Sequence, residues 1–192
     1  MQQQTKKRRI ILILLEKQIS SQNEKLISLK AEENYLQTLL HSLHTSSNIK
    51  NLKQPITLRY QSFSKYRGSL TWPIKGRLLA HYGSPRDISK YTWKGIIIAA
   101  PSGANIVASA SGKVIFADWL RGLGLLIILD HGEQYMTLYG NNDALLKQEG
   151  DDLSANELIA QSSVRGMHKN SGLYFEIRHQ GIPTDPLIWL KQ

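Results

Sequence analysis

Between residues 12 and 43, apolar residues recur at alternating intervals of three and four. Eight of the ten positions on this seam are apolar, and the ten are Leu12, Leu15, Ile19, Gln22, Leu26, Leu29, Glu33, Leu36, Leu40 and Leu43. A repeat of this length without Gly or Pro is typical of an amphipathic helix with a coiled-coil face. The sequence therefore predicts a coiled-coil-type helical arm over residues 1–45, paired with a second copy or another helix. The alternative is a surface helix that packs on its own domain.

The pattern changes after the arm. Residues 46–69 are rich in Ser, Asn and Lys, which is typical of a linker. From residue 70 onward, short runs of Ile, Val, Leu and Tyr alternate with turn residues, at 95–100, 106–110, 113–117, 125–130, 135–139 and 173–178. Such runs predict a mainly antiparallel β domain over residues 70–192. The expected fold class is therefore α+β, a helix followed by this β domain.

Charge and composition narrow the range of functions. The chain of 192 residues has no cysteine, which excludes disulfides, thiolate zinc sites and cysteine nucleophiles. Residues 1–70 carry 12 Lys or Arg against 4 Asp or Glu, whereas residues 71–192 carry 12 against 11. The basic excess thus belongs to the arm, where it suits an acidic protein or a membrane surface. Since the arm lacks interleaved aromatic residues, no nucleic-acid partner is expected.

The start of the chain has some features of an export signal. Basic residues at positions 6–9 precede six apolar residues at positions 10–15. A signal peptide needs an apolar run of about 7–15 residues, and a spanning helix needs about 20. We therefore expect no clear signal peptide, and either a cytoplasmic chain or an N-terminal truncation.

Three segments of the β domain resemble the signature segments of the LytM (lysostaphin-type) zinc peptidases. They are residues 91–100 (YTWKGIIIAA), 130–141 (DHGEQYMTLYGN) and 172–178 (GLYFEIR). In that family the segments carry the patterns H-x-G-x-D, Y-x-H and H-x-H-F-E. The slots of the metal ligands and catalytic histidines are filled here by Trp93, Ile97, Asn141, Gly172 and Tyr174. The framework residues of the same patterns remain, namely Gly95, Tyr139, Phe175 and Glu176.

The chain is most similar to a non-catalytic branch of that family, the EnvC-type murein hydrolase activators. The resemblance rests on Trp-Lys-Gly at 93–95, Ala-Asp-Trp-Leu at 117–120, Leu-Tyr-Phe-Glu-Ile-Arg at 173–178, and a helical segment before the entry segment at 67–73. It implies a protein that activates a peptidoglycan amidase in bacterial cell division. It further implies a periplasmic location, an arm that contacts a division-associated membrane complex, and possible contact with peptidoglycan.

Metal-dependent catalysis is not expected from these residues. A hydrolytic zinc site needs about three protein ligands and an open position for water, which Trp93, Ile97 and Tyr174 do not supply. His131 in a hairpin turn and His168 in a polar loop have no partner at ligand spacing, and His41 and His44 lie on the arm. We therefore predict no catalytic residue, no metal and no cofactor. An active zinc endopeptidase and a passive peptidoglycan-binding module are the alternatives.

The former active-site cleft is the candidate partner site. Aromatic residues with a neighbouring Lys or Arg anchor many protein interfaces. The predicted partner-binding residues are Trp93, Lys94, Leu123, Leu126, Tyr139, Tyr174 and Arg178. Such a groove suits an amphipathic helix of the partner. The alternative for Trp93 and Tyr174 is that they fill the core of an inactive site.

Overall fold

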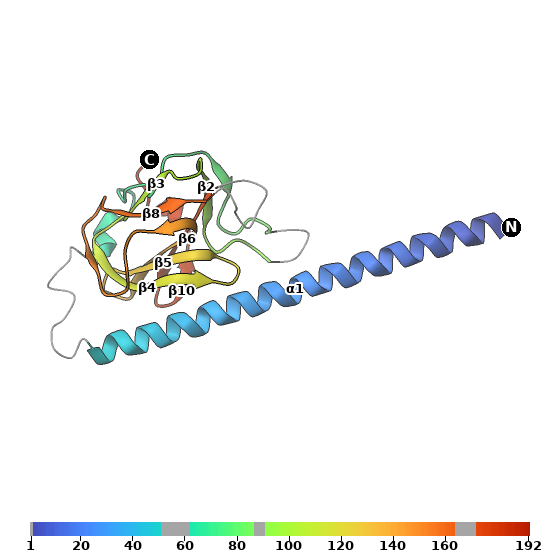
Figure 1. Ribbon diagram of the computed structural model, residues 1–192, viewed down its shortest axis with the longest axis horizontal. Helices are drawn as coiled ribbons and strands as arrows, with labels where there is room; N and C mark the ends of the chain where they lie inside the picture. Colours follow the sequence, from blue (N-terminus) through green and yellow to red (C-terminus); the bar gives the residue numbers. More distant parts are fainter. Residues whose placement is uncertain (1, 51–61, 87–90, 164–171) are drawn as a thin grey trace.

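The computed structural model describes residues 2–50, 62–86, 91–163 and 172–192, and places one long helix before a β domain (Figure 1). The helix, α1 (Gln2–Lys50), is followed by the short 3-10 helix η3 (Phe63–Tyr66), and η4 (Pro186–Ile188) lies near the C-terminus. The strands are β1 (Leu78–Ala80), β2 (Ile96–Ala99), β3 (Asn105–Val107), β4 (Gly112–Leu120), β5 (Gly124–Asp130), β6 (Tyr135–Leu145), β7 (Asp152–Leu153), β8 (Leu158–Ser162), β9 (Gly172–His179) and β10 (Ile182–Thr184).

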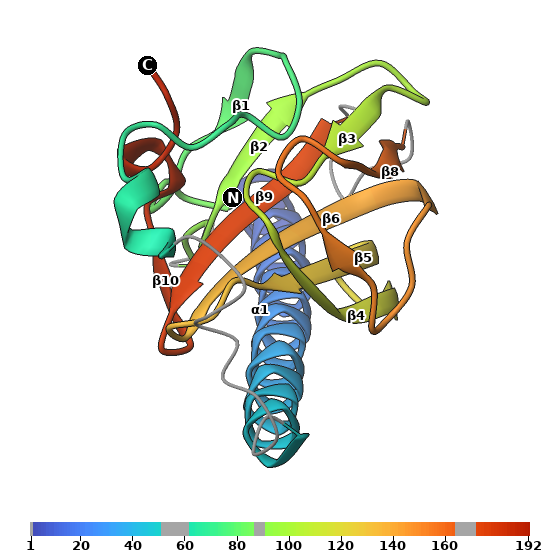
Figure 2. The same cartoon turned by 90° about the vertical axis from the view of Figure 1, so that its left-hand side faces the viewer.

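The ten strands form one sheet, in which every pair of named strands is antiparallel. The main order is β1-β2-β9-β6-β5-β4-β7, with β10 on β9 and with β8 joining β6 to β3. Figure 2 shows β9 and β6 crossing the middle of the domain, with α1 beside them. The predicted α+β class is confirmed.

Both faces of the sheet are buried, since alternate residues of its central strands enter different clusters. On β2, Ile96 and Ile98 belong to one cluster and Ile97 to the other. On β9, Phe175 belongs to the first cluster and Tyr174 to the second. Successive side chains of a strand point to opposite faces, so this alternation follows from the extended backbone. The second cluster is the one that α1 completes.

η3 anchors the chain to the first cluster. Phe63 is fully buried and stacks on Tyr135, with ring centroids 4.9 Å apart, and Trp189 lies 5.2 Å away. Packing of the β domain therefore begins before residue 70, inside the expected linker. The helix also runs five residues past the expected boundary at 45, to Lys50. Residues 51–61 lie outside the described part of the chain.

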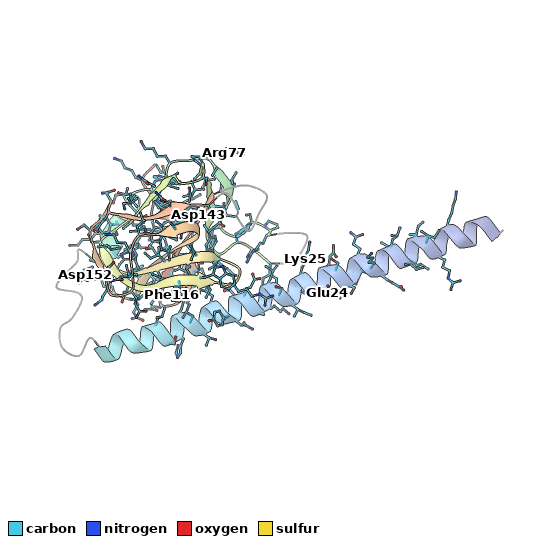
Figure 3. All side chains as sticks on the ribbon, in the orientation of Figure 1. Glu24, Lys25, Arg77, Phe116, Asp143 and Asp152 are labelled. Atoms are coloured by element: carbon cyan, nitrogen blue, oxygen red, sulfur yellow. The ribbon has the colours of Figure 1, made fainter. Side chains whose placement is uncertain are left out.

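α1 lies along one side of the domain, and its N-terminal half extends beyond it (Figure 1). Leu36 and Leu40 are buried in the second cluster, and Phe116 packs against this cluster on the side of the domain that faces α1 (Figure 3). Leu12 and Leu15, on the same seam, are about half exposed. The C-terminal half of the seam thus packs on its own domain, whereas a coiled-coil partner for the N-terminal half stays a prediction. Among the described residues, no helix has an apolar stretch long enough to cross a bilayer.

Candidate functional site

The structure brings together the five residues that fill the ligand and catalytic slots. Ile97 on β2 pairs with Tyr174 on β9. The rings of Trp93 and Tyr174 lie 6.0 Å apart at 43°, and both are buried. Asn141 donates a hydrogen bond from Nδ2 to the carbonyl oxygen of Gly172 at 2.5 Å. The slots therefore form a buried patch that is apolar around Trp93, Ile97 and Tyr174 and is held by a side-chain hydrogen bond at Asn141.

Gly172 and Gly95 allow β2 and β9 to approach closely. A Cβ atom at Gly172 would lie 2.5 Å from the carbonyl oxygen of Ile98. A Cβ atom at Gly95 would lie 2.3 Å from the carbonyl oxygen of Phe175. Both distances are far inside van der Waals contact with backbone atoms, which cannot move without moving a strand. Glycine at these two positions is thus a requirement of the packing.

A row of polar side chains continues from Tyr174 along the same face of β9. The Tyr174 hydroxyl donates to Glu176 Oε2 at 2.6 Å, and Arg178 Nε donates to Glu176 Oε1 at 2.5 Å. All three side chains are buried. Desolvation raises the pKa of Glu176 although the charge of Arg178 opposes it, and desolvation followed by the charge of Glu176 raises the pKa of Tyr174 well above its usual value. Removing one member of such a buried ion pair typically costs about 3–5 kcal/mol, because the other charge stays buried.

The patch and its neighbours form a groove, which we define by Trp93, Ile97, Leu123, Leu126 and Tyr174. These five residues are buried in the second cluster. Leu36 and Leu40 of α1 belong to the same cluster and are 5% and 4% exposed. Leu29 and Leu36 also line one small cavity together with Trp93, Leu123 and Tyr174, so α1 covers this part of the groove.

Charged residues of α1 flank these leucines. Glu32 Oε2 lies 3.6 Å from Arg86 Nη2, and the Arg86 guanidinium lies 4.8 Å from the centre of the Trp93 ring. Glu33 Oε1 lies 3.7 Å from Arg178 Nη2. A cavity of about 30 Å³ remains between α1 and the groove, beside Lys94. The contact between helix and groove thus leaves little empty space and includes two pairs of opposite charges.

Most of the predicted partner-binding residues meet at this place. Trp93, Leu123, Leu126 and Tyr174 are in the groove, Lys94 lines the small cavity, and Arg178 contacts α1. The structure places Tyr139 elsewhere. It is fully buried in the first cluster, where its hydroxyl accepts from the Ser109 backbone N–H at 2.9 Å and from Thr137 Oγ1 at 3.1 Å.

Tyr139 and Asn141 are two residues apart on β6, and two such residues share a face of a regular strand. That rule holds for regular strands, but Asn141 has a φ of 65°. A left-handed residue interrupts the extended backbone, and Asn is among the few residue types that adopt it readily. Tyr139 is therefore a core residue.

The sequence pattern does not predict that α1 covers the groove, and it does not single out Arg86. The seam residues Leu36 and Leu40 were assigned to a coiled coil, because leucines at heptad spacing look the same whichever apolar surface covers them. One signal was present. Glu33 occupies a seam position where an apolar residue is usual, and in the structure it pairs with a buried guanidinium.

The histidines give no sign of a metal centre in the described residues. No group of three or more His, Cys, Asp or Glu side chains there could hold a metal ion. His131 is buried and bonds through its ring nitrogens to the Ser111 carbonyl oxygen and to Thr137 Oγ1. His41 is exposed on α1, whereas His168 and the side chain of His44 lie outside the described residues. The absence of metal and of catalysis stays a prediction.

Two murein hydrolase activators are similar to this chain in sequence. Murein hydrolase activator EnvC of Escherichia coli (strain K12) is 40% identical over 124 residues, which cover 65% of this chain and 29% of that protein. Murein hydrolase activator NlpD of Salmonella dublin is 38% identical over 122 residues, which cover 63% of this chain and 31% of that protein. This chain therefore spans less than one third of the length of either activator.

A solved structure extends the comparison to the fold. A zinc containing peptidase from Vibrio cholerae superposes with a TM-score of 0.57 at 20% identity, over 63% of this chain and 40% of that chain. The sequence profile of Peptidase family M23 matches residues 91–186, half of the chain, which include all five slot residues. The chain belongs to Peptidase family M23, the family of LytM-type domains.

Proposed function

We propose that this protein is a non-catalytic activator of a peptidoglycan amidase in bacterial cell division, acting in the periplasm. Its groove binds a helix of the amidase, and α1 covers the groove until that helix displaces it. The proposal treats the ligand slots as a former active site that has become a protein-binding surface.

The observation that carries the proposal is the occupancy of the groove by α1. Leu36 lines the same small cavity as Trp93, Leu123 and Tyr174, and Leu40, one helical turn further on, is buried in the same cluster. The groove therefore has an apolar lining that already accommodates the leucine face of one helix. A partner helix with apolar residues at the same spacing would make the same contacts. The names of EnvC and NlpD, which are murein hydrolase activators, support the same role.

Displacement of α1 gives the mechanism. A ligand shifts an equilibrium between two states only through its different affinity for them. An amidase helix binds the form of the chain in which α1 has left the groove, and the groove in turn favours the form of the amidase in which that helix has left the enzyme. Each protein thus selects the open form of the other.

The experiment is an amidase activation assay with a groove variant that leaves the core intact. Lys94 is half-buried beside the groove, so Lys94→Ala removes a contact at the surface and spares the core. We expect a loss of activation of tenfold or more, since truncating an interface anchor typically costs about 2 kcal/mol. Pro85→Ala, which changes an exposed residue that does not line the groove, is the control and should leave activation unchanged.

Two further measurements complete the test. Direct capture of the amidase by the intact chain separates the proposal from a passive peptidoglycan-binding module, which would bind murein but leave the amidase inactive. Arg178→Ala is a poor probe, because it leaves the buried carboxylate of Glu176 without its ion-pair partner and would destabilise the fold. Equal activation by Lys94→Ala and the parent chain, with amidase bound by both, would place the partner site outside the groove.

A further inference from the structure

A second cavity lies between α1 and the turn that joins β9 to β10. Its volume is about 390 Å³, within the range of about 300–1,000 Å³ that is typical of small-molecule sites. Leu40, Met136 and Ile182 provide apolar lining, and Leu40 and Met136 are themselves buried. The cavity is separate from the small space beside Lys94, which has a different lining.

One buried guanidinium lines this cavity and has an unused donor. Arg178 is 1% exposed, with Nε bonded to Glu176 and Nη1 donating to the Gly181 carbonyl oxygen at 3.3 Å. Its Nη2 donates no hydrogen bond to any described residue. Glu33 Oε1 lies 3.7 Å from Nη2, which is an ion-pair distance but is longer than a hydrogen bond. A buried N–H without a partner is costly, so this donor favours an acceptor that enters the cavity.

The other polar side chains of the cavity are the imidazole of His41 on α1 and three amides. Gln37 of α1, Gln134 of the turn before β6 and Gln180 of the turn before β10 line it. A side-chain amide both donates and accepts hydrogen bonds, so it matches the N–H and C=O groups of a peptide. A guanidinium matches a carboxylate, which accepts from two of its N–H groups in one plane.

We propose that this cavity is a binding site for a carboxylate-bearing short peptide. The carboxylate takes the place of Glu33 beside Arg178 Nη2, which is covered in the unliganded chain, and accepts its hydrogen bond. An apolar side chain of the ligand lies on Met136 and Leu40, and its peptide groups face the glutamines. The carboxylate is either the free C-terminus of a peptide or an acidic side chain of a protein segment, and the two sources are separated below. This site does not depend on the groove having an amidase partner.

Competition with Glu33 follows from this placement. The ligand carboxylate and Glu33 approach the same Nη2 atom, so each lowers the affinity of Arg178 for the other. Glu33→Gln removes the competing charge and keeps the size of the side chain. Glu32→Gln is the matched control, because Glu32 pairs with Arg86 instead.

The experiment follows the Met136 methyl group by NMR in the full chain labelled with ¹³C-methyl methionine, which has three methionines to assign. The probes are N-acetyl-alanyl-alanine, its neutral C-terminal amide, and N-acetyl-glutamyl-alanine amide, whose only carboxylate is on the side chain. We expect saturable shifts of Met136 with at least one acidic probe, about tenfold tighter than with the neutral amide. The tighter of the two acidic probes identifies the source of the carboxylate.

Glu33→Gln should tighten binding of that acidic probe several-fold and leave binding of the neutral amide unchanged, whereas Glu32→Gln should behave as the parent chain. Thermal melts of both variants check that the fold is intact. The proposal is overturned if Met136 shows no saturable shift in either the parent chain or Glu33→Gln. It is also overturned if acid and amide bind equally, or if Glu33→Gln weakens binding of the acid.

Discussion

Replacing Leu36 and Leu40 together by alanine should release α1 from the groove while the β domain stays folded. Each substitution removes three carbon atoms from a side chain that is at most 5% exposed. At about 0.8 kcal/mol for each buried carbon, the loss is about 2.4 kcal/mol per leucine and about 5 kcal/mol for the pair. A change of that size shifts the equilibrium between covered and open groove by more than about a thousandfold.

Hydrogen–deuterium exchange measures the release directly. Amides of α1 near residues 32–43 should exchange much faster in the double variant, whereas amides of β5, β6 and β9 should keep their protection. Leu12→Ala with Leu15→Ala is the control, since these leucines belong to the same seam but are about half exposed. The reasoning is refuted if exchange in α1 is unchanged, or if the β domain loses protection together with the helix. The released variant should also activate an amidase at lower concentration than the parent chain.

Three other measurements test separate parts of the structure. Burial lowers the pKa of His131 from 6.5 to about 4, with the hydrogen bond to Ser111 opposing the shift. The folded chain therefore holds a neutral imidazole. The free energy of unfolding should fall by about 3 kcal/mol as the pH drops from about 6.5 to about 4. Urea titrations measure this pH dependence, and most of it should disappear in the variant His131→Gln. Tyr139→Phe should cost about 1–3 kcal/mol of stability, because the buried Ser109 N–H loses its acceptor, and should leave amidase binding unchanged. Elemental analysis of the purified protein should find no stoichiometric zinc, and a bound equivalent whose chelation abolishes a lytic activity would contradict the non-catalytic proposal.

The fold was predictable because both of its periodicities are local. A heptad pattern requires a helix, and short alternating runs separated by turns require strands, whatever lies beside them. The surface that covers the seam was not predictable in the same way. Burial of Leu36 and Leu40 contributes the same hydrophobic free energy whether a second helix or the groove covers them. Only tertiary structure distinguishes these two partners.

The candidate site was predictable where it depended on residue identity and unpredictable where it depended on backbone geometry. The slot residues Trp93, Ile97 and Tyr174 meet as expected, because the strands that carry them are neighbours in the sheet. Tyr139 was misplaced, since a positive φ at Asn141 is not visible in a pattern of polar and apolar positions. The burial of Arg178 was also hidden, because charged residues are rarely fully buried unless paired.

The tight contact at Gly172 has a consequence for anyone who would engineer a hydrolase from this scaffold. The resemblance to LytM peptidases places a histidine there, but any side chain would begin 2.5 Å from the Ile98 carbonyl oxygen. Replacing Gly172 alone by histidine would therefore push β2 away from β9 and lower the yield of folded protein. A redesign that introduces a side chain at residue 172 has to respace these two strands first, because the obstacle is the backbone itself.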